Sequence, residues 1–182
     1  MPKSRTFFLG LLAALILATT QAEGGKTMQL ASRAFTDGGK IPQQYVMPGA
    51  GGRNVSIPLS WTDPPGGTRS FALSIIDPHP IARHWVHWLV INIPAESNSL
   101  AEGASGKNMP PGAVELKNSF GQPGYGGPQP PPGTGDHPYV VTLYALKVAQ
   151  LDLSPNTDRN TFEKTLEGKI LASASLTGYY GR

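Results

Sequence analysis

The sequence predicts an all-β fold with one short helix near its end. Two observations lead to this prediction. First, 22 glycines and 18 prolines lie between short apolar runs instead of filling one tail, which is typical of strands linked by turns. Second, three of these runs are rich in β-branched and aromatic residues and are therefore expected to be strands; they span Arg69 to Asp77, Trp85 to Ile93 and Tyr139 to Val148.

Residues 1–22 have the pattern of a secretory signal peptide. Lys3 and Arg5 precede an apolar run at residues 7–18, and Ala22 closes a stretch of small residues suited to cleavage. The apolar run is shorter than the roughly 20 residues that span a bilayer, so no transmembrane span is expected in the mature form. We expect an exported protein, periplasmic or secreted, with a single domain at 23–182.

The composition excludes several classes of function. The chain has 15 Lys and Arg and 12 Asp and Glu; without Lys3 and Arg5 these become 13 and 12, a net charge of +1. No run of basic residues remains, which argues against a nucleic-acid surface or a polybasic membrane patch. The absence of cysteine excludes disulfides and thiolate metal sites.

The early part of the chain contains two further candidate strands. Met28 to Phe35 alternates weakly, and the run at 54–62 alternates clearly, with Val55, Ile57, Leu59 and Trp61 on one face. Because Pro58 cannot donate to a ladder, we expect this second strand at a sheet edge or with a bulge.

His87 lies inside the apolar run that begins at Trp85. Strict alternation places it on the same face as Leu89 and Ile91, with Val86, Trp88 and Val90 on the other face. A histidine in such a run is most often a satisfied core residue, and in either case its nitrogens need partners because an unpaired buried polar group costs about 1–3 kcal/mol. Asp77, at the end of the preceding strand, is the nearest candidate in the sequence.

The stretch from Phe120 to Tyr139 holds six prolines and six glycines, so it can be neither a helix nor a central strand. A loop this long inside a domain usually serves a function. Rigid proline and exposed glycine N–H groups can form a cradle for an anion. His137 ends this loop, so two imidazoles, backbone N–H groups and a tyrosine hydroxyl could donate to phosphate or carboxylate oxygens, with Asp77 orienting an imidazole.

The last part of the chain predicts a helix and a closing strand. Thr157 can cap a helix over Thr157 to Glu167, in which Phe162 and Leu166 share a face and Gly168 ends it. The alternating segment from Lys169 to Tyr180 then predicts the final strand.

Two motifs in order, about 40 residues apart, resemble the phosphatidylethanolamine-binding protein (PEBP) family, and its bacterial branch in particular. The first is Asp77-Pro78 with Trp85-Val86-His87-Trp88, and the second runs from Gly126-Gly127-Pro128 to His137-Pro138-Tyr139. The resemblance covers nearly the whole mature chain. It implies a β-sandwich of a large and a small sheet with a helix near the C-terminus and a small anion pocket at one end.

The resemblance also implies a function and a set of residues. It implies a non-enzymatic binding protein for phosphorylated head groups or similar anions, with no cofactor; some family members inhibit kinases or proteases, so a protein partner is possible. By motif position the ligand-binding residues are Asp77, Trp85, His87, Gly127, Pro131, His137, Tyr139 and Tyr180. Three positions depart from the family pattern: His79 replaces an acid, Pro138 an arginine and Gln129 a cysteine.

The alternative function is a metal-dependent hydrolase. Four histidines, at 79, 84, 87 and 137, accompany Asp77, and histidine and carboxylate suit Zn²⁺. However, His84 and His87 have opposite strand parity, so only one could point into a common pocket if the strand includes residue 84. Nucleophilic catalysis is disfavoured because the sequence has no cysteine and no G-x-S-x-G motif.

Overall fold

The computed structural model describes residues 26–182, so the predicted signal peptide at 1–22 lies outside it. Its strands are β1 (Gln29–Ala31), β2 (Leu59–Thr62), β3 (Ser70–Asp77), β4 (Trp85–Pro94), β5 (Ser99–Leu100), β6 (Val114–Leu116), β7 (His137–Leu146) and β8 (Ile170–Tyr180). The helices are α1 (Arg159–Leu166) and two short 3₁₀ turns, η1 (Gln43–Tyr45) and η2 (Pro48–Ala50). The helices of this described part are too short and polar to cross a bilayer.

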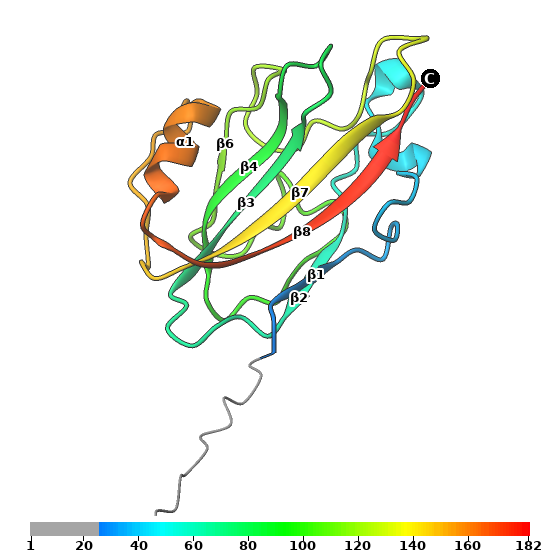
Figure 1. Ribbon diagram of the computed structural model, residues 1–182. Helices are drawn as coiled ribbons and strands as arrows, with labels where there is room; N and C mark the ends of the chain where they lie inside the picture. The colour runs from blue at the N-terminus through cyan, green and yellow to red at the C-terminus, as the bar shows by residue number, and fades with distance from the viewer. Residues whose placement is uncertain (1–25) are drawn as a thin grey trace, which may run out of the picture.

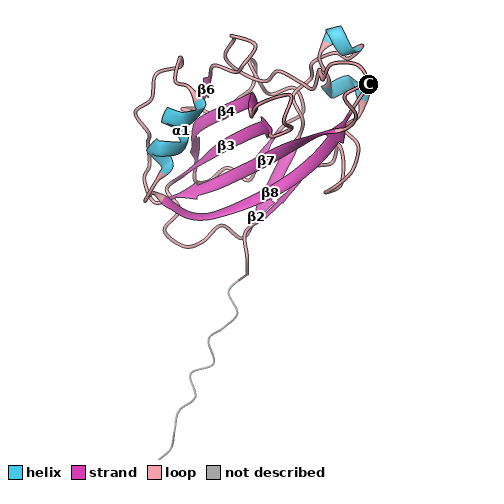
Figure 2. Ribbon diagram, turned by 45° about the horizontal axis from the view of Figure 1, so that its top comes forward, coloured by secondary structure: helices cyan, strands magenta, loops and turns pink. Residues whose placement is uncertain are grey.

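The strands form two sheets, as the sequence predicted. The small sheet has the order β1-β2-β5 and the large sheet the order β6-β4-β3-β7-β8, and neighbouring strands are antiparallel. Figure 1 shows α1 on one side of the large sheet and β1 and β2 on the other, and Figure 2 shows β4, β3, β7 and β8 lying side by side. The all-β prediction, with a large and a small sheet and one helix, is confirmed.

The central strand β3 of the large sheet is buried on both faces, whereas the edge strand β8 is largely exposed. One face packs against the small sheet through residues such as Trp61, Phe71 and Leu143, and the other packs against α1 through residues such as Ala72 and Phe162. Burial on both faces explains why β3 is an almost continuous apolar run and not an alternating one.

Strand β4 does not alternate regularly, so the predicted faces of Val86 and His87 were wrong, whereas Leu89 and Ile91 share one face and Trp88 and Val90 the other, as predicted. Trp88 lies opposite Ile75 whereas Val86 lies opposite Ile76, which makes His87 the extra residue of a β-bulge. A second irregularity lies near Asn92, whose φ is 59°. As a result Val86, Leu89 and Ile91 pack toward α1, whereas Trp88, Val90 and Ile93 pack between the sheets.

Two local expectations also need correction. Strand β2 is the central strand of the small sheet and not an edge strand; it begins directly after Pro58, so the missing N–H of that proline lies outside the ladder. Helix α1 begins at Arg159 and is capped by Asp158, whose side chain accepts a hydrogen bond from the Thr161 N–H at 2.8 Å. Thr157 is therefore not the cap.

Candidate ligand-binding site

The strand pairing gathers the polar residues of both motifs at one end of the large sheet. The C-terminal end of β3 lies between the N-terminal ends of β4 and β7, because both neighbours run antiparallel to it. Asp77 pairs with Trp85 across one side, and Ile76 pairs with Val140 across the other. This topology brings Asp77, His87 and His137 together although up to 60 residues separate them.

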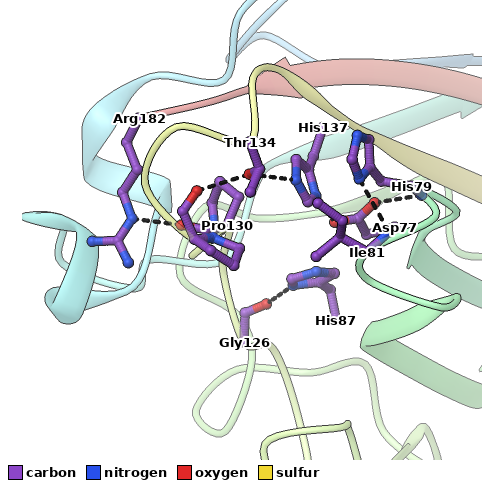
Figure 3. Close-up of polar contacts among 10 residues, drawn as sticks. Asp77, His79, Ile81, His87, Gly126, Pro130, Thr134, His137 and Arg182 are labelled. Carbon is purple, nitrogen blue, oxygen red and sulfur yellow. Dashed lines mark hydrogen bonds and ion pairs between the residues drawn. The ribbon is translucent and has the colours of Figure 1, made fainter.

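Asp77 pairs with His137 and not with His87. The Nδ1 of His137 lies 2.6 Å from Oδ2 of Asp77, and the two residues are 1% and 3% exposed. The other carboxylate oxygen, Oδ1, accepts a hydrogen bond from the backbone N–H of His79 at 2.8 Å. Figure 3 shows this network at the ends of the strands. The sequence had indicated His87 as the nearest partner because it could not show how β7 lies beside β3.

The Thr134 hydroxyl contacts the second ring nitrogen of His137, Nε2. This hydroxyl lies 2.7 Å from the Pro131 carbonyl, which can only accept, and 2.9 Å from Nε2 of His137. The hydroxyl has one proton, so with the Asp77 carboxylate ionised all of these contacts are hydrogen bonds only when both His137 nitrogens carry protons. In that state the His137 imidazolium balances the charge of the Asp77 carboxylate.

His87 has a different environment. Its Nδ1 lies 2.6 Å from the carbonyl oxygen of Gly126, and its ring packs edge-on against Tyr139 and Phe120. Burial lowers the pKa of His87 from its usual 6.5 to about 4, because the charged ring would lose its hydration. The ring is therefore neutral at neutral pH, with its proton on Nδ1, so it cannot donate from Nε2 to an anion as the sequence had suggested.

A cavity of about 360 Å³ lies in front of these groups, a size at the lower end of ligand pockets. Apolar side chains form most of its walls. Its lining residues are Asp77, Ile81, Ala82, Trp85, His87, Phe120, Gln129, Pro130, Pro131, His137 and Tyr139. The Tyr139 hydroxyl is buried and has no hydrogen-bond partner in the described structure. Burial is also the main reason why the pKa of Tyr139 is raised, so this hydroxyl keeps its proton.

Two of the eight predicted site residues do not line the cavity. Gly127 donates its N–H to Oδ1 of Asn54 at 2.7 Å, and a Cβ at this position would lie 2.1 Å from the Tyr45 carbonyl oxygen. Glycine is required there for this close backbone approach. Tyr180 pairs with His137 in the sheet, but its hydroxyl lies 3.2 Å from Oε1 of Gln43 and 3.3 Å from the Ala50 carbonyl oxygen, which share its one proton.

The sequence did not identify several residues that shape the site. Ile81, Phe120 and Pro130 line the cavity, and Thr134 contacts His137. Pro130 is held from outside, because Nε of Arg182 donates to its carbonyl oxygen at 2.5 Å. The dense proline and glycine content of the loop was the available signal, but composition alone does not tell which side chains face inward.

The remaining histidines do not complete a metal site. His79 stacks on His137 with 3.8 Å between ring centroids, whereas His84 precedes β4 and faces a separate groove beside α1. Within residues 26–182, no three His, Cys, Asp or Glu side chains are grouped so that they could hold a metal ion.

Comparisons with known proteins agree with the geometry. Residues 31–181 match the family described as phosphatidylethanolamine-binding protein. The chain belongs to this family. The relatives of this PEBP family member include UPF0098 proteins from Aquifex aeolicus and Escherichia coli. The first is 38% identical over 87% of this chain and 91% of the relative, and the second, YbhB, is 37% identical over 84% and 99%.

Solved structures of PEBP proteins share the fold. Escherichia coli YbcL, described as a member of the mammalian PEBP family, superposes with a TM-score of 0.81 at 32% identity, covering 86% of this chain and 99% of that one. A PEBP homolog from Chlamydia trachomatis has a TM-score of 0.75 at 35% identity, with 86% and 98% covered. Membership of the family supports a binding protein.

Proposed function

We propose that this protein binds small phosphorylated or similarly anionic head groups in the cavity in front of Asp77, His87 and His137, and that it does so without catalysis. The observation that carries the proposal is the buried, unpartnered hydroxyl of Tyr139, a residue that lines that cavity. Buried polar groups are nearly always hydrogen-bonded, so an orphaned hydroxyl beside a cavity indicates a missing ligand group or water.

The surroundings of the cavity support this proposal. The Tyr139 hydroxyl can donate to an anion, and the Asp77 carboxylate in the same lining is paired with His137, so it does not face that anion as an unbalanced negative charge. The apolar walls, which include Trp85 and Phe120, lower the local dielectric and strengthen such contacts. Trp85 and Ile81 are also exposed, at 38% and 55%, so an apolar portion attached to the head group would meet apolar side chains.

The hydrolase alternative receives less support from the geometry. Both nitrogens of His137 are engaged by protein groups, and His87 uses one nitrogen for Gly126. A metal would have to displace Asp77 or Thr134 from His137 to bind it.

We also propose that this protein is exported. The basic and apolar pattern of residues 1–22 is that of a signal peptide. One relative, LppC of Mycobacterium tuberculosis, which is 42% identical over 92% of this chain, carries the word lipoprotein in its name. This chain has no cysteine to carry a lipid, so we propose a free exported protein.

Tyr139→Phe tests the proposal. It removes the hydroxyl and leaves the ring that packs on His87. Loss of a hydrogen bond to a charged ligand should weaken phosphate binding about ten- to a hundredfold in Kd. The free energy of unfolding should stay the same or rise, because an unpaired buried hydroxyl is destabilising. Calorimetric titration with inorganic phosphate and O-phosphoethanolamine, together with urea unfolding, measures both quantities.

Tyr144→Phe is the matched control. Tyr144 lies on the same strand but on the α1 side, where its hydroxyl is 3.4 Å from that of Ser74, so phosphate affinity should not change. If wild type and Tyr139→Phe bound phosphate equally, or if neither ligand bound to the wild type, the proposed site would be wrong.

A further inference from the structure

The hydrogen-bonding character of His87 is determined by its contacts. The Gly126 carbonyl can only accept, so the proton of the His87 ring lies on Nδ1. The buried ring stays neutral at neutral pH, since burial lowers its pKa to about 4. Its second nitrogen, Nε2, therefore carries a lone pair and acts only as an acceptor.

This lone pair borders the cavity. His87 is among the lining residues, and within residues 26–182 the side-chain hydrogen bond of this ring is made by Nδ1, to the Gly126 carbonyl. A bound ligand therefore meets an acceptor at this wall.

The charge balance of the cavity lining also disfavours a ligand with two negative charges. The Asp77 carboxylate is balanced by His137 when both nitrogens of that ring donate. The lining residues of this cavity, all of them in the described part of the chain, include no lysine or arginine. A ligand with two negative charges would therefore find no surplus positive charge, and it would place an oxygen lone pair against Nε2 of His87.

We infer that the cavity selects anionic groups that still carry a proton, and that it prefers the monoanion of a phosphate monoester over both the phosphate dianion and a sulfate ester. This inference rests on the proposed function and names the ligand class of the same site. The P–OH group of the monoanion donates to Nε2 of His87, and its other oxygens accept from Tyr139. His87 is thus a specificity-determining residue.

Methyl phosphate and methyl sulfate are the two probes, because they test whether a proton on the anionic group affects binding. At pH 5 both are monoanions of similar shape, but only the phosphate carries a hydroxyl. The wild type should bind methyl phosphate at least about tenfold more tightly than methyl sulfate at pH 5, because a sulfate oxygen cannot donate and leaves the acceptor unpaired.

The same ratio at pH 8 provides the second measurement. The second pKa of a phosphate monoester is about 6, so its monoanion falls about a hundredfold between pH 5 and pH 8. The ratio of the two affinities should therefore fall between pH 5 and pH 8 by about the same factor as the fraction of methyl phosphate that is monoanionic. Methyl sulfate does not titrate in this range, and both probes meet the same protein at each pH. The ratio therefore cancels pH effects on the protein that act on both probes alike.

Two variants assign the effect to one residue. His87→Asn can still donate an amide N–H to Gly126 but has no acceptor at the position of Nε2, so the pH 5 ratio should fall to within about threefold of unity. Tyr139→Phe should weaken both esters and leave the ratio unchanged. Thermal unfolding of each variant shows that it is folded, and the wild-type measurements stand without either variant.

The outcomes separate this inference from the proposed function. Tight binding of methyl phosphate with a ratio that falls at pH 8 supports the inference. Equal binding of both esters at pH 5 leaves an anion-binding site but overturns the selection by His87. Binding of neither ester overturns the anion site itself, and the inference with it.

Discussion

At the scale of single residues, the three buried polar side chains of the site are stabilised in different ways. Asp77 and His137 satisfy each other at 2.6 Å, whereas His87 relies on one backbone carbonyl. Removing one partner of a buried pair leaves an uncompensated charge and typically costs about 3–5 kcal/mol. Loss of ligand binding in an Asp77 or His137 variant would thus be confounded with loss of the fold, and Tyr139 gives a cleaner test.

The lowered pKa of His87 predicts a pH-dependent stability. Between pH 6.5 and about 4 the unfolded chain binds a proton at this residue that the folded chain does not. Stability should therefore be complete above pH 6.5 and fall as the pH drops to about 4, by up to about 3 kcal/mol from this residue. Urea unfolding of the wild type at several pH values between 4 and 8 measures this loss.

His87→Asn is the control for this pH dependence. Other groups also titrate in acid, so the informative quantity is the difference between the unfolding free energies of the two proteins at each pH. The variant should lose less stability than the wild type between pH 6.5 and 4. Parallel profiles would show that His87 is not the group responsible.

At the scale of elements, irregular features decide where side chains point. The bulge at His87 removes this residue from the regular alternation of β4 and lets its ring reach Tyr139. Without the bulge, His87 would share a face with Leu89 and Ile91, which pack toward α1. The site therefore depends on one extra residue in one strand.

The cap of α1 gives a prediction at this scale. Asp158→Ala removes the hydrogen bond to the Thr161 N–H and should lower the midpoint of thermal unfolding by about 3 °C. The backbone N–H of Thr161 also lowers the pKa of Asp158, so the stabilisation should weaken in acid as this carboxylate becomes protonated. Thr157→Ala should lower the unfolding midpoint by less. If it lowered the midpoint by more than Asp158→Ala does, Thr157 would be the cap, as the sequence had suggested.

At the scale of the whole molecule, the apolar core and the polar site occupy different parts of the large sheet. The small sheet and α1 pack against opposite faces of its central strands, and the polar site lies at one end of its strands (Figure 3). The apolar faces hold β3, β4 and β7 in register, which places Asp77 beside His137. The loop at 120–139 then closes over the strand ends, and Arg182 holds its Pro130 carbonyl.

Export is a prediction about the whole chain. We expect the protein to be exported and cleaved after Ala22, so the mature chain should begin near Glu23, because residues 1–22 have the pattern of a signal peptide. Amino-terminal sequencing of the protein recovered outside the cytoplasm checks this. A mature protein that still began with Met1 or Pro2 would contradict the expectation.

The sequence by itself determined the class of fold, most of the strands and the family. Strands β3, β4 and β7 follow from local content of β-branched and aromatic residues, and the PEBP motifs follow from residue identity at fixed spacing. Both signals are local, so a single chain displays them directly.

Only the tertiary structure decided which polar side chains pair, which ring nitrogens carry protons and which side chains face the cavity. Asp77 meets His137 because β7 lies beside β3, a pairing between residues 60 positions apart that no local pattern records. The acceptor role of His87 depends on the Gly126 carbonyl and on burial, and the faces of β4 depend on a bulge in its pairing with β3. Hydrogen-bond direction, desolvation and strand register arise from contacts between distant segments, so they become visible only when the chain is folded.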